Sequence, residues 1–254
     1  MRVALFVTCL VDLLRPSIGF AAIKLLENAG CTVEVAATQT CCGQPAYNGG
    51  DRAAAIALAR KTIAEFEHCQ RDQGCAYLVT PSGSCADQIR NAYPALLADD
   101  PAWQSRAEHL AARAYELTDF LVTVLHVESV PGDFAGSVSY HDSCSGLRGL
   151  GIREQPRALL ALVPGLTLRE MPAAEECCGF GGAFSIKFGA ISAAIAEKKC
   201  VNARLAAADA LVGGDLGCLL NIEGKLRRMG DRHTRVLHVA EVLAGVSTAD
   251  ATPN

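Results

Sequence analysis

Two short strings, QTCCGQPAYNGG at residues 39–50 and EECCGFGGAF at residues 175–184, contain the same Cys-Cys-Gly triplet. Neighbouring side chains point to opposite sides of an extended backbone, so one loop brings both sulfurs to a single site only if it bends sharply. Gly43 and Gly179 follow the two pairs, and glycine adopts the positive φ angles that allow such a bend and leave backbone N–H groups facing sulfur. The repeated triplet therefore predicts two similar turns, each delivering two thiols.

The segments around the two triplets follow one another in the same order. Apolar runs rich in β-formers predict strands, and amphipathic stretches predict helices between them. Strands alternating with helices are typical of parallel sheets with right-handed crossovers. We therefore expect an α/β fold with two pseudo-symmetric Rossmann-like halves and mainly parallel sheets. The expected strands are 2–8, 31–37, 75–81, 137–142, 166–172 and 208–214, and the expected helices include 51–69, 102–114, 117–125, 153–165 and 186–207.

The spacing of the cysteines supports a duplication. Cys9 precedes Cys41 by 32 positions and Cys144 precedes Cys177 by 33, while Cys42 precedes Cys85 by 43 and Cys178 precedes Cys218 by 40. Four cysteines thus recur in one order at nearly equal intervals. We expect a first cysteine-rich domain with connecting helices at 1–125, a second at 126–246, and a disordered tail at 247–254.

Each of these eight cysteines follows the end of a predicted strand. The carboxyl ends of parallel strands lie at one edge of a sheet, where open α/β sheets bind ligands. We therefore expect the thiols to converge as two four-cysteine sites. Soft sulfur ligands suit an iron–sulfur cluster or Zn²⁺ rather than Mg²⁺ or Ca²⁺. The candidate ligands are Cys9, Cys41, Cys42 and Cys85 in the first half and Cys144, Cys177, Cys178 and Cys218 in the second.

Other residues near these cysteines are expected to support the sites without binding the metal, and the remaining cysteines to take no part in them. Backbone N–H groups at Gly43 and Gly179 would tune a cluster's potential. His141, three residues before Cys144, is either a donor beside the ligands or a structural histidine. The remaining cysteines have no counterpart in the other half and are expected to be simply buried: Cys31, Cys69, Cys75 and Cys200.

Composition excludes several classes of function. A net charge of −4 argues against nucleic acid as a partner, which requires a clustered basic surface. No stretch approaches the ~18 apolar residues of a membrane span, and the first residues read poorly as a signal peptide. A cytoplasmic location is therefore expected. There thiols stay reduced, so twelve cysteines favour metal binding or redox chemistry over structural disulfides.

The paired triplets resemble the cysteine-rich CCG domain family, found twice in this chain from about residue 2 to residue 242. That family includes the heterodisulfide reductase, glycolate oxidase and lactate utilization branches. The strings most similar to the lactate utilization branch are PSGSC (81–85), HDSC (141–144), CCGFGGAFSIK (177–187) and GCLLNI (217–222). This resemblance implies an iron–sulfur component of a multi-subunit system that oxidises L-lactate, with a ferredoxin-type iron–sulfur subunit and a third small subunit as partners.

The chain also departs from some family members. They carry a fifth cysteine per half, where this chain has Ser82 or Asn221. Four thiolates suffice for a [4Fe–4S] cluster, and one half could hold zinc instead. The sequence contains no ferredoxin cysteine run and no clear flavin or NAD fingerprint, so we expect the chain to work inside a complex. The leading hypothesis is an iron–sulfur electron-transfer subunit of a complex that oxidises L-lactate to pyruvate. The alternatives are a thiol/disulfide oxidoreductase subunit and a zinc-binding scaffold.

Overall fold

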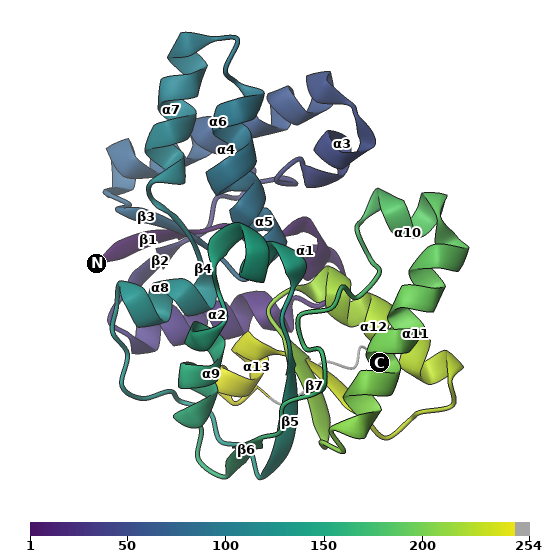
Figure 1. Ribbon diagram of the computed structural model, residues 1–254. Helices are drawn as coiled ribbons and strands as arrows, with labels where there is room; N and C mark the ends of the chain where they lie inside the picture. Colours follow the sequence, from purple (N-terminus) through teal and green to yellow (C-terminus); the bar gives the residue numbers. More distant parts are fainter. Residues whose placement is uncertain (247–254) are drawn as a thin grey trace.

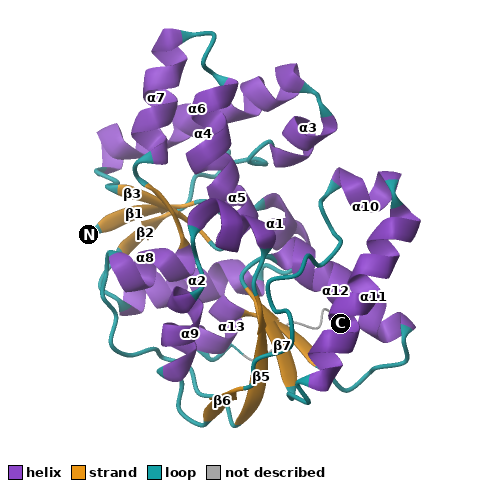
Figure 2. Ribbon diagram, in the orientation of Figure 1, coloured by secondary structure: helices purple, strands orange, loops and turns teal. Residues whose placement is uncertain are grey.

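Each half of the chain forms one four-stranded sheet in which every strand pair is parallel (Figure 2). The computed structural model describes residues 1–246, and the expected disordered tail at 247–254 lies outside the described residues. The predicted α/β fold with two similar halves is confirmed. The order β2-β1-β3-β4 (Thr32–Glu34, Arg2–Leu5, Tyr77–Thr80, Ala114–Glu116) recurs as β6-β5-β7-β8 (Leu166–Leu168, Gly136–His141, Ala210–Gly213, Arg235–His238).

Helices connect the strands of the first half and cover its sheet (Figure 1). The longest, α4 (Arg52–Gln73), begins after Asp51, whose carboxylate accepts a hydrogen bond from the Ala54 N–H, and ends at Gly74 with φ of 74°. These are standard start and stop signals. The others are α1 (Cys9–Leu14), α2 (Ser17–Asn28), α3 (Gln44–Gly49), α5 (Gly83–Asp87), the π-helical turn η1 (Gln88–Ala92), α6 (Tyr93–Leu96), α7 (Pro101–Ala111) and α8 (Leu117–Thr123).

The second half repeats this arrangement with differences in its long crossover. The expected helix at 186–207 is interrupted, because Phe188 leaves the helical region with φ of −127° and ψ of 48°. The result is a short α10 (Ala183–Lys187) followed by α11 (Gly189–Leu205). The remaining elements are the π-helical turn η2 (Ser145–Gly149), α9 (Glu154–Ala161), α12 (Leu216–Arg228) and α13 (Val239–Ala244).

Two strands were absent from the sequence-based prediction. β4 lies between the expected helices at 102–114 and 117–125, and β8 follows α12. Each is only three or four residues long and adds to the edge of a sheet, too short for a period-two pattern to stand out. The predicted strands at 31–37 and 166–172 also end early, at Glu34 and Leu168.

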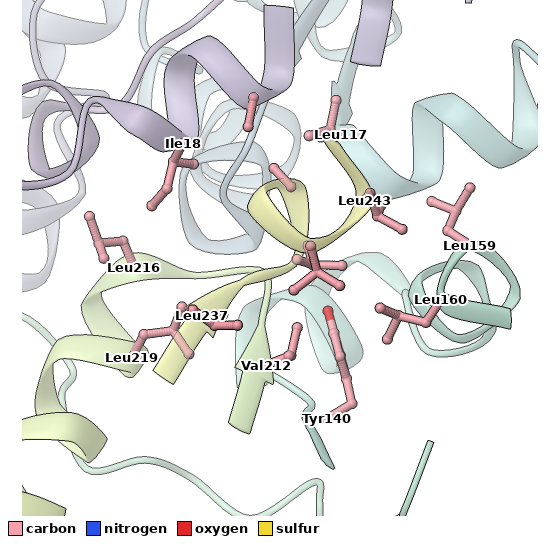
Figure 3. Packing of buried hydrophobic residues seen from close by; sticks show 14 of the residues in the cluster. Ile18, Leu117, Tyr140, Leu159, Leu160, Val212, Leu216, Leu219, Leu237 and Leu243 are labelled. Carbon is pink, nitrogen blue, oxygen red and sulfur yellow. The ribbon is translucent and has the colours of Figure 1, made fainter. Parts of the chain in front are cut away.

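One hydrophobic core joins the two halves. Ile18 of α2 and Leu117 of α8 pack in the same cluster as Leu243 of α13 and Leu159 of α9 (Figure 3). Burial of such side chains is worth about 1.5–3 kcal/mol each, so this cluster holds the sheets in one arrangement. The expected boundary at 125/126 falls between Glu116, where β4 ends, and Gly136, where β5 begins.

Polar contacts join the carboxyl ends of the two sheets. The Asp215 carboxylate accepts a hydrogen bond from the Ser84 N–H at 2.9 Å, and the Gly83 N–H donates to the Gly214 carbonyl at 3.3 Å. Ser84 and Asp215 follow β3 and β7, the equivalent strands of the two sheets. The carboxyl-terminal edges of the two sheets therefore face each other. None of the helices in residues 1–246 is long and apolar enough to cross a membrane.

Candidate metal centre

Four cysteines converge at the carboxyl edge of the first sheet, as the sequence predicts. Cys9 begins α1, Cys41 and Cys42 lie in the loop before α3, and Cys85 lies in α5. The Sγ atoms of Cys42 and Cys85 are 3.3 Å apart, and the Cys41 sulfur is hydrogen-bonded to the thiols of Cys9 and Cys42. We call these residues the first cysteine group.

The second cysteine group consists of Cys144, Cys177, Cys178 and Cys218, in the matching positions of the second half. The Cys177 sulfur is hydrogen-bonded to the thiols of Cys144 and Cys178, and Cys178 is in turn hydrogen-bonded to Cys218. All eight predicted ligand residues are therefore brought together as two groups of four. Both groups lie at the ends of strands that are far apart in the sequence.

The two Cys-Cys-Gly loops have the bend that their sequence implies. Gly43 and Gly179 both have φ of 84°, in the left-handed region. The Gly43 N–H donates to the Cys41 Sγ at 3.4 Å, and the Gly179 N–H donates to the Cys177 Sγ at 3.3 Å. The expectation that glycine N–H groups face sulfur is confirmed.

The two groups open into one cavity of about 250 Å³ between the halves. The sequence predicts two sites but not that they face each other, because that depends on how the halves pack. Polar side chains from both halves share the lining, among them Gln44, Asn48 and Asp215. The cysteines that line the cavity are Cys9, Cys41 and Cys42 of the first group and all four of the second.

One thiol in each group is strongly acidic. Hydrogen bonds from Cys42 and Cys9 lower the pKa of Cys41 to about 3. Hydrogen bonds from Cys144 and Cys178 lower the pKa of Cys177 to about 2. The partner thiols show the opposite effect, since the hydrogen bond to Cys41 and then burial raise the pKa of Cys9. In each group, the pKa of one thiol is therefore lowered by its neighbours, while the pKa of the thiols around it is raised.

Polar side chains beyond the repeated cysteines hold both loops in place. The Tyr93 hydroxyl donates to the Cys42 carbonyl at 2.8 Å, and the Asn221 amide donates to the Cys178 carbonyl at 2.9 Å. Sequence reasoning did not find Tyr93, which lies eight residues beyond Cys85 and carries no motif. Asn221 lies three residues after Cys218, and its hydrogen bond gives that position a structural role.

The surroundings of the two groups differ. His141 is 1% exposed, and a nitrogen of its ring lies within 4.8 Å of the Cys178 and Cys218 sulfurs. Phe6 occupies the corresponding position in the first half, where it packs with Cys42 and Cys85. Burial, and then the charge of Lys199, lower the pKa of His141 to about 3, so the imidazole is neutral near pH 7.

Lys199 of α11 is a further residue that sequence reasoning missed. Its buried ammonium donates to the carbonyls of Ala173 and Ala174 at 2.8 and 3.0 Å, and so fixes the segment before the second Cys-Cys-Gly loop. Burial lowers the pKa of this lysine. No sequence signal marks it, because it lies among ordinary charged residues of a long helix.

The other four cysteines lie away from the cavity. Cys31 and Cys200 are buried and unpaired, as expected. Cys69 and Cys75 are also buried, but their sulfurs are bonded to each other, contrary to the expectation that the thiols stay reduced. The end of α4 at Gly74 turns the chain back, so these two residues meet although neither carries a pairing signal.

The donor set fits a metal ion or an iron–sulfur cluster. Four convergent thiols in each group match the usual number of cluster ligands, and backbone N–H groups already point at sulfur. Within residues 1–246, the mixed group of His141, Cys178 and Cys218 also has the close spacing that one ion requires.

The duplicated parallel sheets and the paired thiol groups define a cysteine-rich α/β protein built from two copies of one unit. The Cysteine-rich domain family, CCG, matches residues 3–90 and 138–223, and the chain belongs to this family. The chain is 45% identical over 243 residues to Lactate utilization protein A of Bacillus cytotoxicus and 46% identical to that of Geobacillus kaustophilus, covering 96% of this chain and 98% of each relative.

A solved structure shares the fold. A hypothetical protein from Helicobacter pylori superposes with a TM-score of 0.66 at 14% identity, over 98% of this chain. This chain spans about half of that protein, 50% of its length. The similarity supports the two-sheet architecture described above.

Proposed function

We propose that this protein is an iron–sulfur electron-transfer component of a system that oxidises L-lactate to pyruvate. The observation that carries the proposal is the convergence of the eight motif cysteines as two groups of four; seven of the eight line one cavity between the halves. Relatives that match nearly the full chain are named Lactate utilization protein A. The two together favour cluster-based redox chemistry in lactate utilization.

The stoichiometry of the reaction is consistent with two groups. Oxidation of L-lactate to pyruvate releases two electrons and two protons, and a bound [4Fe–4S] cluster would supply one-electron chemistry in each group. The chain's own residues would hold the clusters through Cys9, Cys41, Cys42 and Cys85 and through Cys144, Cys177, Cys178 and Cys218. Gly43 and Gly179 would donate hydrogen bonds to the ligand sulfurs, which makes reduction easier.

We also propose that the chain works with other subunits in the cytoplasm. A ferredoxin-type iron–sulfur subunit and a third small subunit would exchange electrons with it. A reducing compartment suits eight unpaired motif thiols, seven of which line one cavity.

The test is anaerobic purification followed by iron and acid-labile sulfide analysis and EPR of the reduced protein. We expect about four irons for each intact group. Cys42→Ser and Cys178→Ser should each remove or alter a separate signal. Addition of lactate with the partner subunits should reduce the wild-type clusters. A well-folded anaerobic protein that contains zinc, with no iron or sulfide, would support the scaffold alternative instead.

A thiol/disulfide oxidoreductase is the second candidate, and one observation favours it. Cys177 is exposed, hydrogen bonds from Cys144 and then Cys178 lower its pKa, and these two neighbours would serve as resolving thiols. Such a thiolate is a nucleophile toward disulfides. This candidate predicts that a small disulfide oxidises the reduced protein, whereas lactate with partner subunits fails to reduce it.

A further inference from the structure

We propose that His141 is a nitrogen ligand of the metal centre in the second cysteine group, so that the two centres of this protein differ in ligand set. The first centre would be held by four thiolates, and in the second the His141 imidazole would take the place of one of the four thiolates. This inference rests on the proposed function only in expecting a metal or cluster there. It assigns a residue that lies outside the repeated cysteine pattern.

The position of the imidazole carries the proposal. His141 is the last residue of β5, so it ends at the carboxyl edge of the sheet beside the second cysteine group. A ring nitrogen and the Sγ atoms of Cys178 and Cys218 all lie within 4.8 Å of one another. In a tetrahedral site, metal–sulfur bonds are about 2.3 Å long and metal–nitrogen bonds about 2.0 Å. The ligand atoms of one such ion therefore lie just under ~4 Å from one another.

The hydrogen bonding of the ring gives an independent reason. Both ring nitrogens of His141 are buried, and neither makes a hydrogen bond of standard geometry within residues 1–246; the Ala174 backbone is the group near enough to affect the pKa of the ring by hydrogen bonding. A buried polar group without a partner costs about 1–3 kcal/mol, so such groups are rare in folded proteins and mark missing ligands or ions. A bound metal would satisfy one nitrogen.

The first half supplies the contrast. Phe6 stands three residues before Cys9, as His141 stands three residues before Cys144. Phe6 is 3% exposed and belongs to the same buried cluster as Cys42 and Cys85, the counterparts of Cys178 and Cys218. A benzyl side chain cannot coordinate a metal. The equivalent position therefore carries a side chain that can bind a metal in the second half and one that cannot in the first. The difference indicates a distinct task for the second centre.

The experiment isolates each centre in the full-length chain. Cys42→Ser disables the first group and leaves the second, and Cys178→Ser does the reverse. Each is prepared with and without His141→Phe, which gives the second half the residue found in the first. After reconstitution with iron and sulfide, pulsed EPR measures nitrogen hyperfine coupling. We expect the strong coupling of a bound imidazole in Cys42→Ser alone, and its loss when His141→Phe is added.

The control is the Cys178→Ser protein, whose first-group spectrum should not change on addition of His141→Phe and so reports that the fold is intact. The proposal is overturned if the second group shows only the weak coupling of backbone nitrogens, or if its spectrum is the same with Phe at position 141.

If no variant takes up iron, the proposed function fails. Co²⁺ then tests the ligand assignment, since loss of the histidine should change the visible d–d bands of the second group, and unchanged bands would refute the assignment.

Discussion

At the scale of single residues, the glycines of the two loops are equivalent in conformation but not in surroundings. Both have φ of 84°. A Cβ atom at Gly179 would lie 2.6 Å from the Ser192 carbonyl oxygen, whereas one at Gly43 would lie 3.3 Å from the Leu58 Cβ. The second loop therefore packs more closely on its helix, α11, than the first loop packs on α4.

Alanine at these two positions tests that difference. Gly43→Ala should cost about 1–2 kcal/mol, the strain of a left-handed residue with a side chain. Gly179→Ala should cost this strain and a further ~1–3 kcal/mol, because the backbone of α11 must move. Urea unfolding of the metal-free variants measures both losses, and metal analysis should show the larger loss in the second group. Equal destabilisation by the two substitutions would contradict the packing argument.

At the scale of elements, the sequence predicted the convergence of the cysteines better than it predicted the number and bounds of the strands. The strand–loop–helix order around each triplet follows from apolar runs and from the repeat, and it correctly brings the four thiols of each group to one edge. β4 and β8 were missed because three or four residues at a sheet edge give little pattern. The break at Phe188 was missed because it depends on how the loop before α10 folds.

The sequence does not predict that the two cysteine groups face each other, and the reason is physical. It depends on side chains such as Ile18 and Leu243 packing between helices of different halves, and neither carries a signal for its partner. The same limit applies to Tyr93, Lys199 and Asp215, whose roles come from contacts over long sequence separations.

Residues that follow the last motif cysteine of each half provide the second prediction. Tyr93 of α6 supports the first loop, and Asn221 of α12 supports the second, each through the carbonyl of the second cysteine of its pair. Tyr93→Phe and Asn221→Leu each leave a carbonyl without its donor, at a cost of about 1–3 kcal/mol where the group is buried. We expect Tyr93→Phe to alter the EPR signal of the first group alone and Asn221→Leu that of the second alone. The two variants serve as controls for each other, and a signal change in the opposite group would refute the assignment.

At the scale of the whole molecule, Asp215 connects the two thiol groups. It lies three residues before Cys218, and it accepts hydrogen bonds from the Ser84 N–H at 2.9 Å and the Ser82 hydroxyl at 3.4 Å, in the turn that holds Cys85. Asp215 is buried, so its removal leaves the Ser84 N–H, which is partly buried, without an acceptor. A change at this one residue should therefore reach both halves.

Asp209 supplies a matched comparison, since it accepts hydrogen bonds from the N–H and hydroxyl of Ser137 at 2.7 and 2.8 Å, within the second half. Asp215→Ala should lower the free energy of unfolding by about 1–3 kcal/mol and change the spectra of both cysteine groups. Asp209→Ala should destabilise the protein without changing the spectrum of the first group. Urea unfolding and EPR on the two anaerobic variants give both readouts. If Asp215→Ala changed only the second group, the contact between the carboxyl edges would not couple the two centres, and each half would hold its thiols independently.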